Sequence, residues 1–351
     1  MTRPSSVALV LLGVAVGLPG CGVGGGPAGE PVLLRAEALT VTPSTGPVTH
    51  VQVHNPNAAT WRGTVSAEFP PGWKVNQAEQ SVTVGPRQTA RVAFAIERGV
   101  DAADNRYPVR LTAAGGGRTA TREQTIVCAS APYYKPTIDG KLDDWADAIP
   151  ATFVTAGKRT TISTYWSRRS FSLLVAVEED ALVQPSGNGQ AVSDAVQLSL
   201  APHDAMTPET PSGTCRRYEF VLVPAGEGGR CCARIRPGES ASLAAEARPL
   251  AGREVEGAEL AVVRQGGLTY YECAIPLAAM PTLRPDPGRE FCFSLLVHDP
   301  DGTGLRDWGA AAGLWPHQRS RLAWCDFPGA KWPDEPPFDN KIEWGFCSSK
   351  H

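Results

Sequence analysis

The feature that most constrains the fold is a series of short alternating apolar runs, each ended by turn residues. In the first part of the chain these runs lie at 48–53, 64–69, 80–84, 90–96 and 107–113. Prolines, glycines and asparagines separate the runs, and no stretch there keeps a helical period beyond one turn. Alternation with period two places one face of a strand in a core. Strands at this spacing predict a β-sandwich at 31–128.

The same pattern returns after residue 136 and continues to the C-terminus. Its runs lie at 162–166, 171–177, 195–200, 218–223, 258–264, 268–275, 290–297 and 342–347. Eight strands predict a second β-sandwich at 137–351, and the Pro- and Tyr-containing segment 129–136 is interpreted as a linker. The expected fold class is therefore all-β, with two β-sandwich domains.

Several phrases of the first domain resemble a known class of domain. They are Asn-Pro-Asn at 55–57, Trp-Arg-Gly at 61–63, Pro-Pro-Gly-Trp at 70–73 and the strand that begins at Tyr107. In this order they resemble the immunoglobulin-like domains that accompany glycosidases and sugar-binding modules in bacterial exported proteins. The resemblance implies that Trp61 and Trp73 pack in the sandwich core rather than contact a ligand.

The second domain carries a longer series of motifs. These are Thr-Ile-Asp-Gly-Lys-Leu-Asp-Asp-Trp at 137–145, a strand pair ending at Asp180, Ser-Asp-Ala-Val-Gln-Leu at 193–198, Glu-Cys-Ala-Ile-Pro at 272–276, and His-Asp-Pro-Asp-Gly at 298–302. Their order is similar to that of carbohydrate-binding module family 9 over about two hundred residues. The resemblance implies a non-catalytic module that binds a polysaccharide or oligosaccharide by stacking aromatic rings on the sugar.

The resemblance also indicates where the rings should be. One family ring precedes the strand at 195–200, but residues 189–194 contain no aromatic residue. The other falls after the Asp299 turn, where this chain has Trp308 and Trp315. A Pro-rich loop follows, and its Trp324 or Trp332 could replace the missing ring. The alternative is that these large side chains only pin the loop to the sandwich.

Acidic clusters suggest a structural cation, and no other cofactor is expected. Asp139, Asp143 and Asp144 are candidate calcium ligands, because calcium takes carboxylate and carbonyl oxygens. A turn in which the Asp side chains bond their own backbone explains them equally well. The carboxylates around Asp299 are interpreted as a hairpin turn, since an EF-hand would need a glutamate where Ala310 stands.

The N-terminus reads as an export signal. Arg3, an apolar stretch at 7–18 and Leu-Pro-Gly-Cys at 18–21 form a signal peptide at 1–21 that is too short to span a bilayer. Its end resembles that of bacterial lipoproteins, which implies lipidation of Cys21 and anchoring of a cell-envelope protein to the membrane. Ordinary cleavage nearby, giving a secreted protein, is the alternative. Residues 22–30 are interpreted as a Gly-rich tether.

The remaining cysteines number eight, and an even set in an exported chain favours disulfides. Seven of them lie in the second domain, so full pairing requires Cys128 to join that domain. No pair of cysteines has the CxxC spacing that would indicate a zinc site instead of disulfides.

Other function classes find little support. The net charge of −3 without a basic patch argues against a nucleic-acid partner. No GxSxG nucleophile motif is present, and the acidic run 178–180 is interpreted as solvated charge, so no enzyme is expected. The sequence predicts an exported glycan-binding protein. The alternative is a structural or protein-interaction module of the envelope whose sugar site has been lost.

Overall fold

The computed structural model describes residues 30–184, 193–202, 218–224, 230–235, 252–308 and 342–348. Within these ranges the regular elements are β-strands and three single-turn 3-10 segments. The predicted all-β class is therefore confirmed. None of the described residues belongs to a helix long and apolar enough to cross a membrane. Pro31–His351 form one compact unit.

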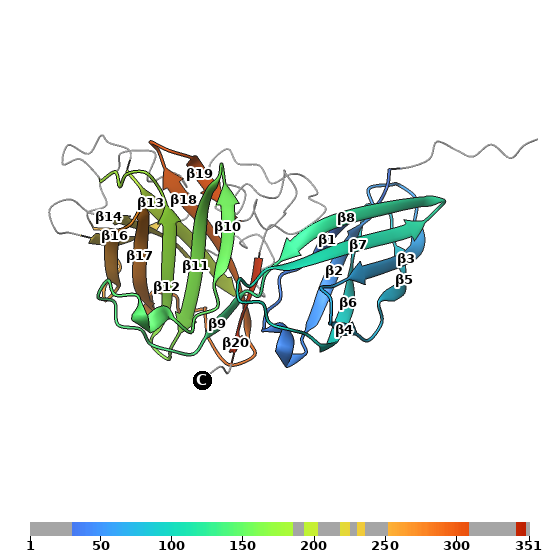
Figure 1. The fold of residues 1–351 in the computed structure, drawn as a ribbon, viewed down its shortest axis with the longest axis horizontal. Coiled ribbons are helices and arrows are strands. Elements are labelled where there is room, and N and C mark those ends of the chain that lie inside the picture. Colours follow the sequence, from blue (N-terminus) through green and yellow to red (C-terminus); the bar gives the residue numbers. More distant parts are fainter. Residues whose placement is uncertain are drawn as a thin grey trace, which may run out of the picture. The chain divides into compact units, whose positions relative to one another are not determined.

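Two four-stranded antiparallel sheets make the first sandwich, with strand orders β1-β2-β6-β4 and β5-β3-β7-β8 (Figure 1). The strands are β1 (Leu33–Ala36), β2 (Val48–His54), β3 (Trp61–Glu68), β4 (Lys74–Val75), β5 (Glu79–Val84), β6 (Thr89–Arg98), β7 (Tyr107–Gly115) and β8 (Arg118–Ile126). Every run predicted from the first part of the sequence falls within or overlaps one of these strands.

The core of this sandwich forms from alternate residues of the strands, as their period requires. Val53, Phe94 and Leu111 are fully buried within it. Trp73 stacks on Phe69, with ring centroids 5.7 Å apart and planes 6° apart. Trp61 and Trp73 both pack against the core, so the interpretation of these two rings as core residues is confirmed.

Buried polar groups add specific contacts inside the first sandwich. Glu37 is buried and accepts hydrogen bonds from the Nε and Nη2 atoms of Arg91 and from the amide of Gln52. At the hairpin between β7 and β8, Gly116 and Gly117 have φ of 60° and 75°, as the turn requires.

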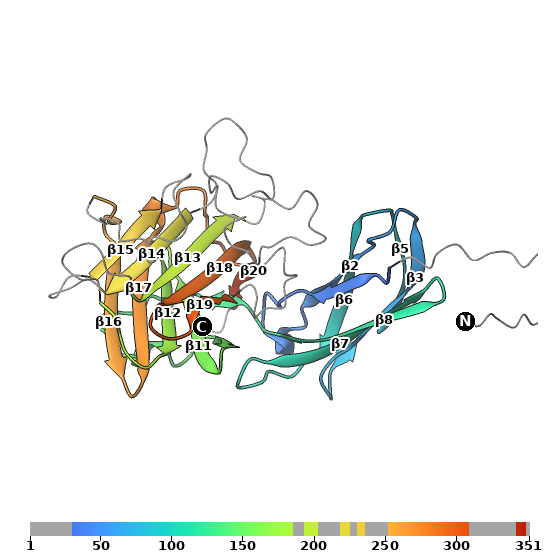
Figure 2. The same ribbon diagram turned by 90° about the horizontal axis from the view of Figure 1, so that it is seen from above.

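A five-stranded and a seven-stranded sheet make the second sandwich. The first has the order β10-β11-β12-β17-β16, and the second has the order β15-β14-β13-β18-β20-β9, with β19 paired to β18. Figure 2 shows β15, β14, β13 and β18 side by side. The strands are β9 (Ser130–Pro132), β10 (Ala151–Thr155), β11 (Lys158–Trp166), β12 (Ser170–Glu178), β13 (Ala195–Pro202), β14 (Tyr218–Pro224), β15 (Arg230–Ile235), β16 (Glu259–Gln265), β17 (Leu268–Pro276), β18 (Glu290–Asp299), β19 (Gly304–Asp307) and β20 (Ile342–Ser348).

The inner faces of these two sheets share one apolar core. Leu173 of β12 and Phe293 of β18 are fully buried in it. Phe171 meets Phe291 edge to face, with centroids 5.7 Å apart, which is a favoured geometry for aromatic rings.

Four of the eight residues of 129–136, the segment interpreted as a linker, are paired with other strands instead. Ser130–Pro132 form β9, which is buried and pairs in parallel with β20. Tyr133 makes a further bridge to Trp166. The backbone groups of the segment are satisfied in a sheet, which its prolines and tyrosines gave no reason to expect.

Asn105, which lies just before β7, connects the segment just before β9 with the segment just before β10. Its φ is 52°, a left-handed conformation that asparagine tolerates better than most residues. The side-chain amide donates to the carbonyls of Cys128 and Pro150, and its oxygen accepts the N–H of Cys128. The side chain is buried, so these bonds are not exchanged with solvent.

Candidate functional site

Trp308, the first ring expected to contact sugar, directly follows β19. Its side chain is only 2% exposed and belongs to the core of the second sandwich. The ring lies 5.7 Å from that of Phe153 on β10, with planes 59° apart. The structure therefore buries the side chain of Trp308 instead of leaving its ring on an open surface. The other predicted rings, Trp315, Trp324 and Trp332, lie outside the described residues.

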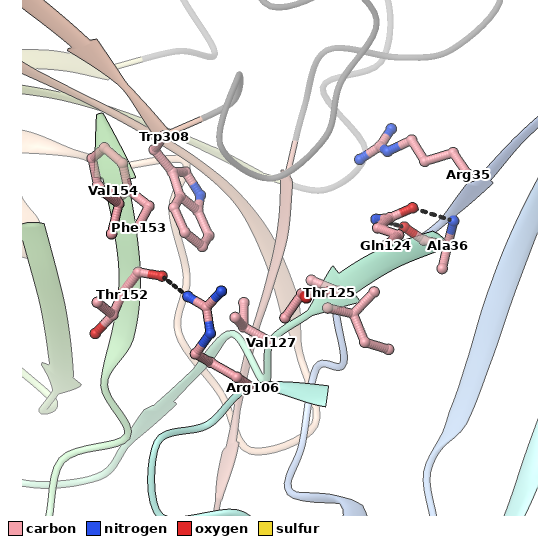
Figure 3. A pocket seen from close by; sticks show the side chains of 12 residues that line it. Arg35, Ala36, Arg106, Gln124, Thr125, Val127, Thr152, Phe153, Val154 and Trp308 are labelled. Atoms are coloured by element: carbon pink, nitrogen blue, oxygen red, sulfur yellow. Dashed lines mark hydrogen bonds between the residues drawn. The ribbon is translucent and has the colours of Figure 1, made fainter. Parts of the chain in front are cut away.

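Trp308 and Phe153 line a cavity of about 210 Å³ (Figure 3). The other described lining residues are Arg35, Ala36, Ala38, Arg106, Gln124, Thr125, Ile126, Val127, Thr152 and Val154. They come from β1, β8, β10 and the segments beside them. The cavity thus joins residues that are far apart in the sequence, and only the chain's tertiary pairing creates it.

Arginine supplies the polar side of the cavity. Arg106 is exposed, and its Nη1 donates to the carbonyl oxygen of Thr152 at 3.3 Å, a long bond that leaves the guanidinium other donors (Figure 3). The amide of Gln124 is committed, because it exchanges two hydrogen bonds with the backbone of Ala36 at 2.9 and 3.1 Å. Gln124 therefore shapes the wall, whereas Arg106 offers donors to the cavity.

The electrostatic character of this region is positive. Arg35 is buried, and burial together with the charge of Arg35 lowers the pKa of the nearby Arg122. Neither Asp nor Glu occurs among the described residues that line the cavity. An aromatic wall facing arginine donors is an arrangement that holds a hydroxylated or anionic ligand without a chemical step.

Two tyrosines that sequence analysis passed over as linker residues are exposed aromatic rings. Tyr133 is 45% exposed and Tyr134 is 38% exposed. Tyr133 meets Trp166 edge to face at 4.8 Å, and Tyr134 meets Tyr165 at 5.1 Å. Consecutive aromatic residues between two prolines were the available signal, but only the structure shows that the rings reach the surface.

The sequence-predicted calcium ligands make local turn contacts. The Asp139 carboxylate accepts the backbone N–H of Lys141 at 2.9 Å and pairs with its ammonium at 2.7 Å. Asp144 accepts the N–H of Thr137 at 2.8 Å, and Asp143 begins a 3-10 turn. These bonds fit the alternative of a self-bonded acidic turn. Calcium at these three aspartates stays a prediction.

Other carboxylates of the described chain do come together. Oxygen atoms of Glu179, Asp194 and Asp299 all lie within 4.8 Å of one another. Glu179 follows β12, Asp194 precedes β13, and Asp299 ends β18. Their exposures are 3%, 0% and 2%. Three strand ends therefore bring three buried acids to one point of the sandwich.

The three carboxylates differ in the hydrogen bonds that they accept. Asp299 Oδ2 accepts from the backbone N–H and hydroxyl of Thr303 and from Arg306. Glu179 Oε1 has a 3.4 Å contact with Arg264, and a hydrogen bond with Thr269 also stabilises the Glu179 carboxylate. Asp194 Oδ2 accepts the N–H of Val183. Glu179 Oε2 and Asp194 Oδ1 have no hydrogen-bond partner among the described residues.

The pKa values of the three carboxyl groups differ in the same way as their hydrogen bonding. Burial raises the pKa of Glu179 to about 7 and that of Asp194 to about 6, because an ionised carboxylate is poorly solvated there. Burial acts in the same direction on Asp299, but the bonds from Thr303 and Arg306 outweigh it and lower its pKa. For Glu179 and Asp194, the stabilising contacts with Thr269, Val183 and Arg264 are too weak to offset burial.

The sequence missed this cluster. Residues 178–180 were interpreted as a solvated charge run, which holds for the exposed Asp180 but is wrong for Glu179. The expected turn at Asp299 is confirmed by its bonds to Thr303. The available signal was that each acid adjoins a strand end, but spacing along the chain does not reveal which ends meet.

Cys128 and Cys273 are both buried. Cys21, Cys215 and Cys325 lie outside the described residues, and side chains are not described for Cys231, Cys232, Cys292 and Cys347. The disulfide pairing of Cys128 with the second domain stays a prediction.

No family model matches the sequence, and no curated relative does. Among solved structures, a carbohydrate-binding module of family 9 from Caldicellulosiruptor kristjanssonii in complex with glucose is similar at 13% identity. It covers 63% of this chain and 97% of that chain, with a TM-score of 0.41. The same module with cellotriose matches at 14% identity, 63% and 94% coverage, and a TM-score of 0.40.

Proposed function

We propose that this protein binds carbohydrate, without a chemical step, in the cavity beside Trp308. The observation that carries the proposal is the meeting of the Trp308 and Phe153 rings with the Arg106 guanidinium in one cavity. A pyranose offers an apolar C–H face to an aromatic ring, and its hydroxyls take hydrogen bonds from planar donors such as guanidinium. Both kinds of group line the cavity, but Trp308 and Phe153 are 2% and 3% exposed, so their rings offer a ligand only a small part of their surface.

The size of the cavity limits the ligand. About 210 Å³ corresponds to roughly seven water molecules at about 30 Å³ each. That space holds a sugar unit but not a length of polysaccharide. The ligand in this proposal is therefore a short saccharide, or a terminal unit or side branch of a longer glycan.

The positions of the described carboxylates favour a sugar-binding function over glycoside hydrolysis. Glycoside hydrolysis requires two carboxyl groups on opposite sides of the scissile bond. No described residue lining the cavity is acidic. The acids that do cluster, around Glu179, are buried at another place in the sandwich. The arrangement supports a binding module.

The N-terminal motif supports export as part of the same proposal. Leu-Pro-Gly-Cys at 18–21 and the Gly-rich stretch after it suit an acylated Cys21 that holds the domains outside the membrane. Membrane fractionation with mass spectrometry of the N-terminal peptide tests this. Intact acylation on Cys21 that disappears in Cys21→Ala is expected, and an unmodified peptide from a freely secreted chain would contradict it.

Binding is tested by a glycan array followed by calorimetry on the positive glycans. Arg106→Ala should weaken binding at least tenfold, because it removes the free donors of an exposed side chain that the fold does not need. Arg110→Ala is the matched control, because Arg110 is an exposed arginine on β7, the strand that follows Arg106, and does not line the cavity. Trp308→Phe keeps an apolar wall while narrowing the aromatic face, and should weaken binding less than Arg106→Ala.

The exposed Tyr133 and Tyr134 rings favour a second location for ligand binding, which would contact either a protein partner or a sugar. The variant Tyr133→Ala distinguishes binding at these rings from binding in the cavity. If glycan binding is lost in Tyr133→Ala and kept in Arg106→Ala, the sugar lies on the tyrosines. If no glycan binds the folded protein at all, the interaction module replaces the sugar-binding proposal.

A further inference from the structure

We propose that the saccharide bound in the cavity beside Trp308 carries an acidic group, and that arginine from the first sandwich selects it by pairing with this carboxylate or sulfate. This selectivity rests on the proposed function, because it belongs to the same cavity. It adds to that function the charge of the ligand and the sandwich that recognises the charge.

The two sandwiches supply different kinds of group to the cavity. The second sandwich contributes the apolar side, through Phe153 and Val154 of β10 and through Trp308. The first sandwich contributes the charged residues of the described lining, which are Arg35 on β1 and Arg106 just before β7. The charge of the described lining is therefore positive, and it comes from the first sandwich.

The aromatic side offers too little surface to bind a sugar by stacking alone. Trp308 and Phe153 are only 2% and 3% exposed. Arg106, by contrast, is exposed, and its Nη1 donates to the carbonyl oxygen of Thr152 at 3.3 Å (Figure 3). A guanidinium has five N–H donors, so this one long bond leaves several of them for a ligand. We therefore expect the arginine side to contribute more to the affinity than the rings do.

The acidic residues nearest in sequence to the described lining do not offset its positive charge from within the cavity. Glu37, Glu123 and Asp307 adjoin lining residues along the chain, but none of the three lines the cavity. Glu37 is paired with Arg91 at 2.6 Å. Glu123 is exposed on β8, in register with Arg110 of β7. An acidic ligand would thus meet arginine without an adjoining carboxylate from these positions.

A further arginine extends the positive region behind the lining. Arg122 lies on the same face of β8 as Gln124, because side chains two apart on a strand share a face. Its Nη1 donates to the carbonyl oxygen of Leu34 at 2.9 Å. Burial, and then the charge of Arg35, lower the pKa of Arg122. A bound anion would reduce the repulsion between these two guanidinium groups.

The fold fixes the backbone of Arg106 for this role. The neighbouring Asn105 and Tyr107 are each 3% exposed, and the Asn105 side chain is bonded to the backbone of Cys128. Asp104 accepts the backbone N–H of Arg106 at 3.3 Å. Only the exposed side chain remains to be ordered on binding, which limits the entropy lost. A planar guanidinium pairs with two oxygens of an anion at once, so Arg106 favours an acidic group over a hydroxyl.

The test compares matched sugars by calorimetry on the mature chain. Methyl glycosides of glucose and of galactose are each used as the neutral sugar, the C6 carboxylate, its uncharged amide and the C6 sulfate. At low ionic strength, at least one acidic form should bind about tenfold more tightly than the neutral and amide forms, since charge-assisted hydrogen bonds are the stronger ones. Added salt should reduce this ratio, because the charge of an exposed arginine is screened.

Three variants assign the preference to Arg106. Arg106→Gln keeps an N–H donor but removes the charge, so acidic and neutral sugars should bind it alike. Arg106→Lys keeps the charge without the planar fork and should give an intermediate ratio. Arg110→Ala removes one exposed positive charge outside the cavity and should leave the ratio unchanged. A purely structural role of Arg106 would change both affinities together and not their ratio.

The ratio of affinities and the binding itself report on different proposals. Binding of the acidic forms alone is the extreme of the expected result. If the neutral sugars bind as tightly as both acidic forms, the acidic preference is overturned while the proposed function stands. A preference that survives Arg106→Gln also overturns the selection by Arg106. If neither these sugars nor any glycan of the array binds the folded chain, the proposed function fails, and the acidic preference fails with it.

Discussion

Replacement of Arg306 by Met should destabilise the second sandwich by roughly 3–5 kcal/mol, the range for removing one partner of a buried ion pair. Arg306 is fully buried, and its Nη2 bonds Asp299 and the carbonyl of Glu178. Its Nε donates to Thr303 at 2.6 Å. The bond to the Asp299 carboxylate alone contributes about 1.5–3 kcal/mol, and the bonds to Thr303 and to the Glu178 carbonyl add to it.

The measurement is urea unfolding at pH 7 in EDTA, followed by tryptophan fluorescence. Arg306→Lys keeps the charge but loses the forked geometry, so it should fall between the wild type and the Met variant. A loss below about 1 kcal/mol in Arg306→Met would show that the buried pair contributes little and would refute the reasoning.

Three further predictions concern the first sandwich and its junction. Asn105→Ala should cost about 3–4 kcal/mol in urea unfolding, since it removes three buried bonds, two of them to Cys128, and leaves a non-glycine residue at positive φ. Asn105→Gly should recover about 1 kcal/mol of that loss, and equal losses would show that backbone strain plays no part. For Glu37, burial raises the pKa, but hydrogen bonds led by Arg91 lower it below the ordinary value of 4.5. The stability it contributes is present above pH 4.5 and is lost as pH falls through the folded pKa, so Glu37→Gln should flatten the acid limb of a Tm-against-pH profile. Gly63→Ala should lower Tm by several degrees, because its new Cβ would lie 2.3 Å from a backbone carbonyl oxygen, and an unchanged Tm would contradict that packing.

The strands were predictable where one face is apolar and the other polar. β6 and β17 show this alternation, and the sequence located both to within a few residues. β8 was missed, because its side chains are mostly Thr, Arg, Glu and Gln and it lies at the edge of its sheet. Its strand conformation comes from pairing with β7, which a local pattern does not reveal.

The candidate sites were harder to predict than the strands. Trp308 was singled out from its place after the Asp299 turn, but its burial depends on β10 lying against it. Arg106 and Phe153, which complete the cavity, carry no local signal that relates them. The same holds for Glu179, which was assigned to the surface because acidic runs usually are solvated.

The sequence by itself determined the all-β class, the two sandwiches and the position of most strands, because alternation and turn residues act over a few neighbouring positions. The tertiary structure alone decided which strand ends meet. Because these strand ends meet, Glu179 is buried beside Asp194 and Asp299. Tertiary contacts also pair β9 with β20 and place Trp308 against Phe153. These contacts join residues far apart in the chain, and their energies depend on burial and distance, which are properties of the folded chain.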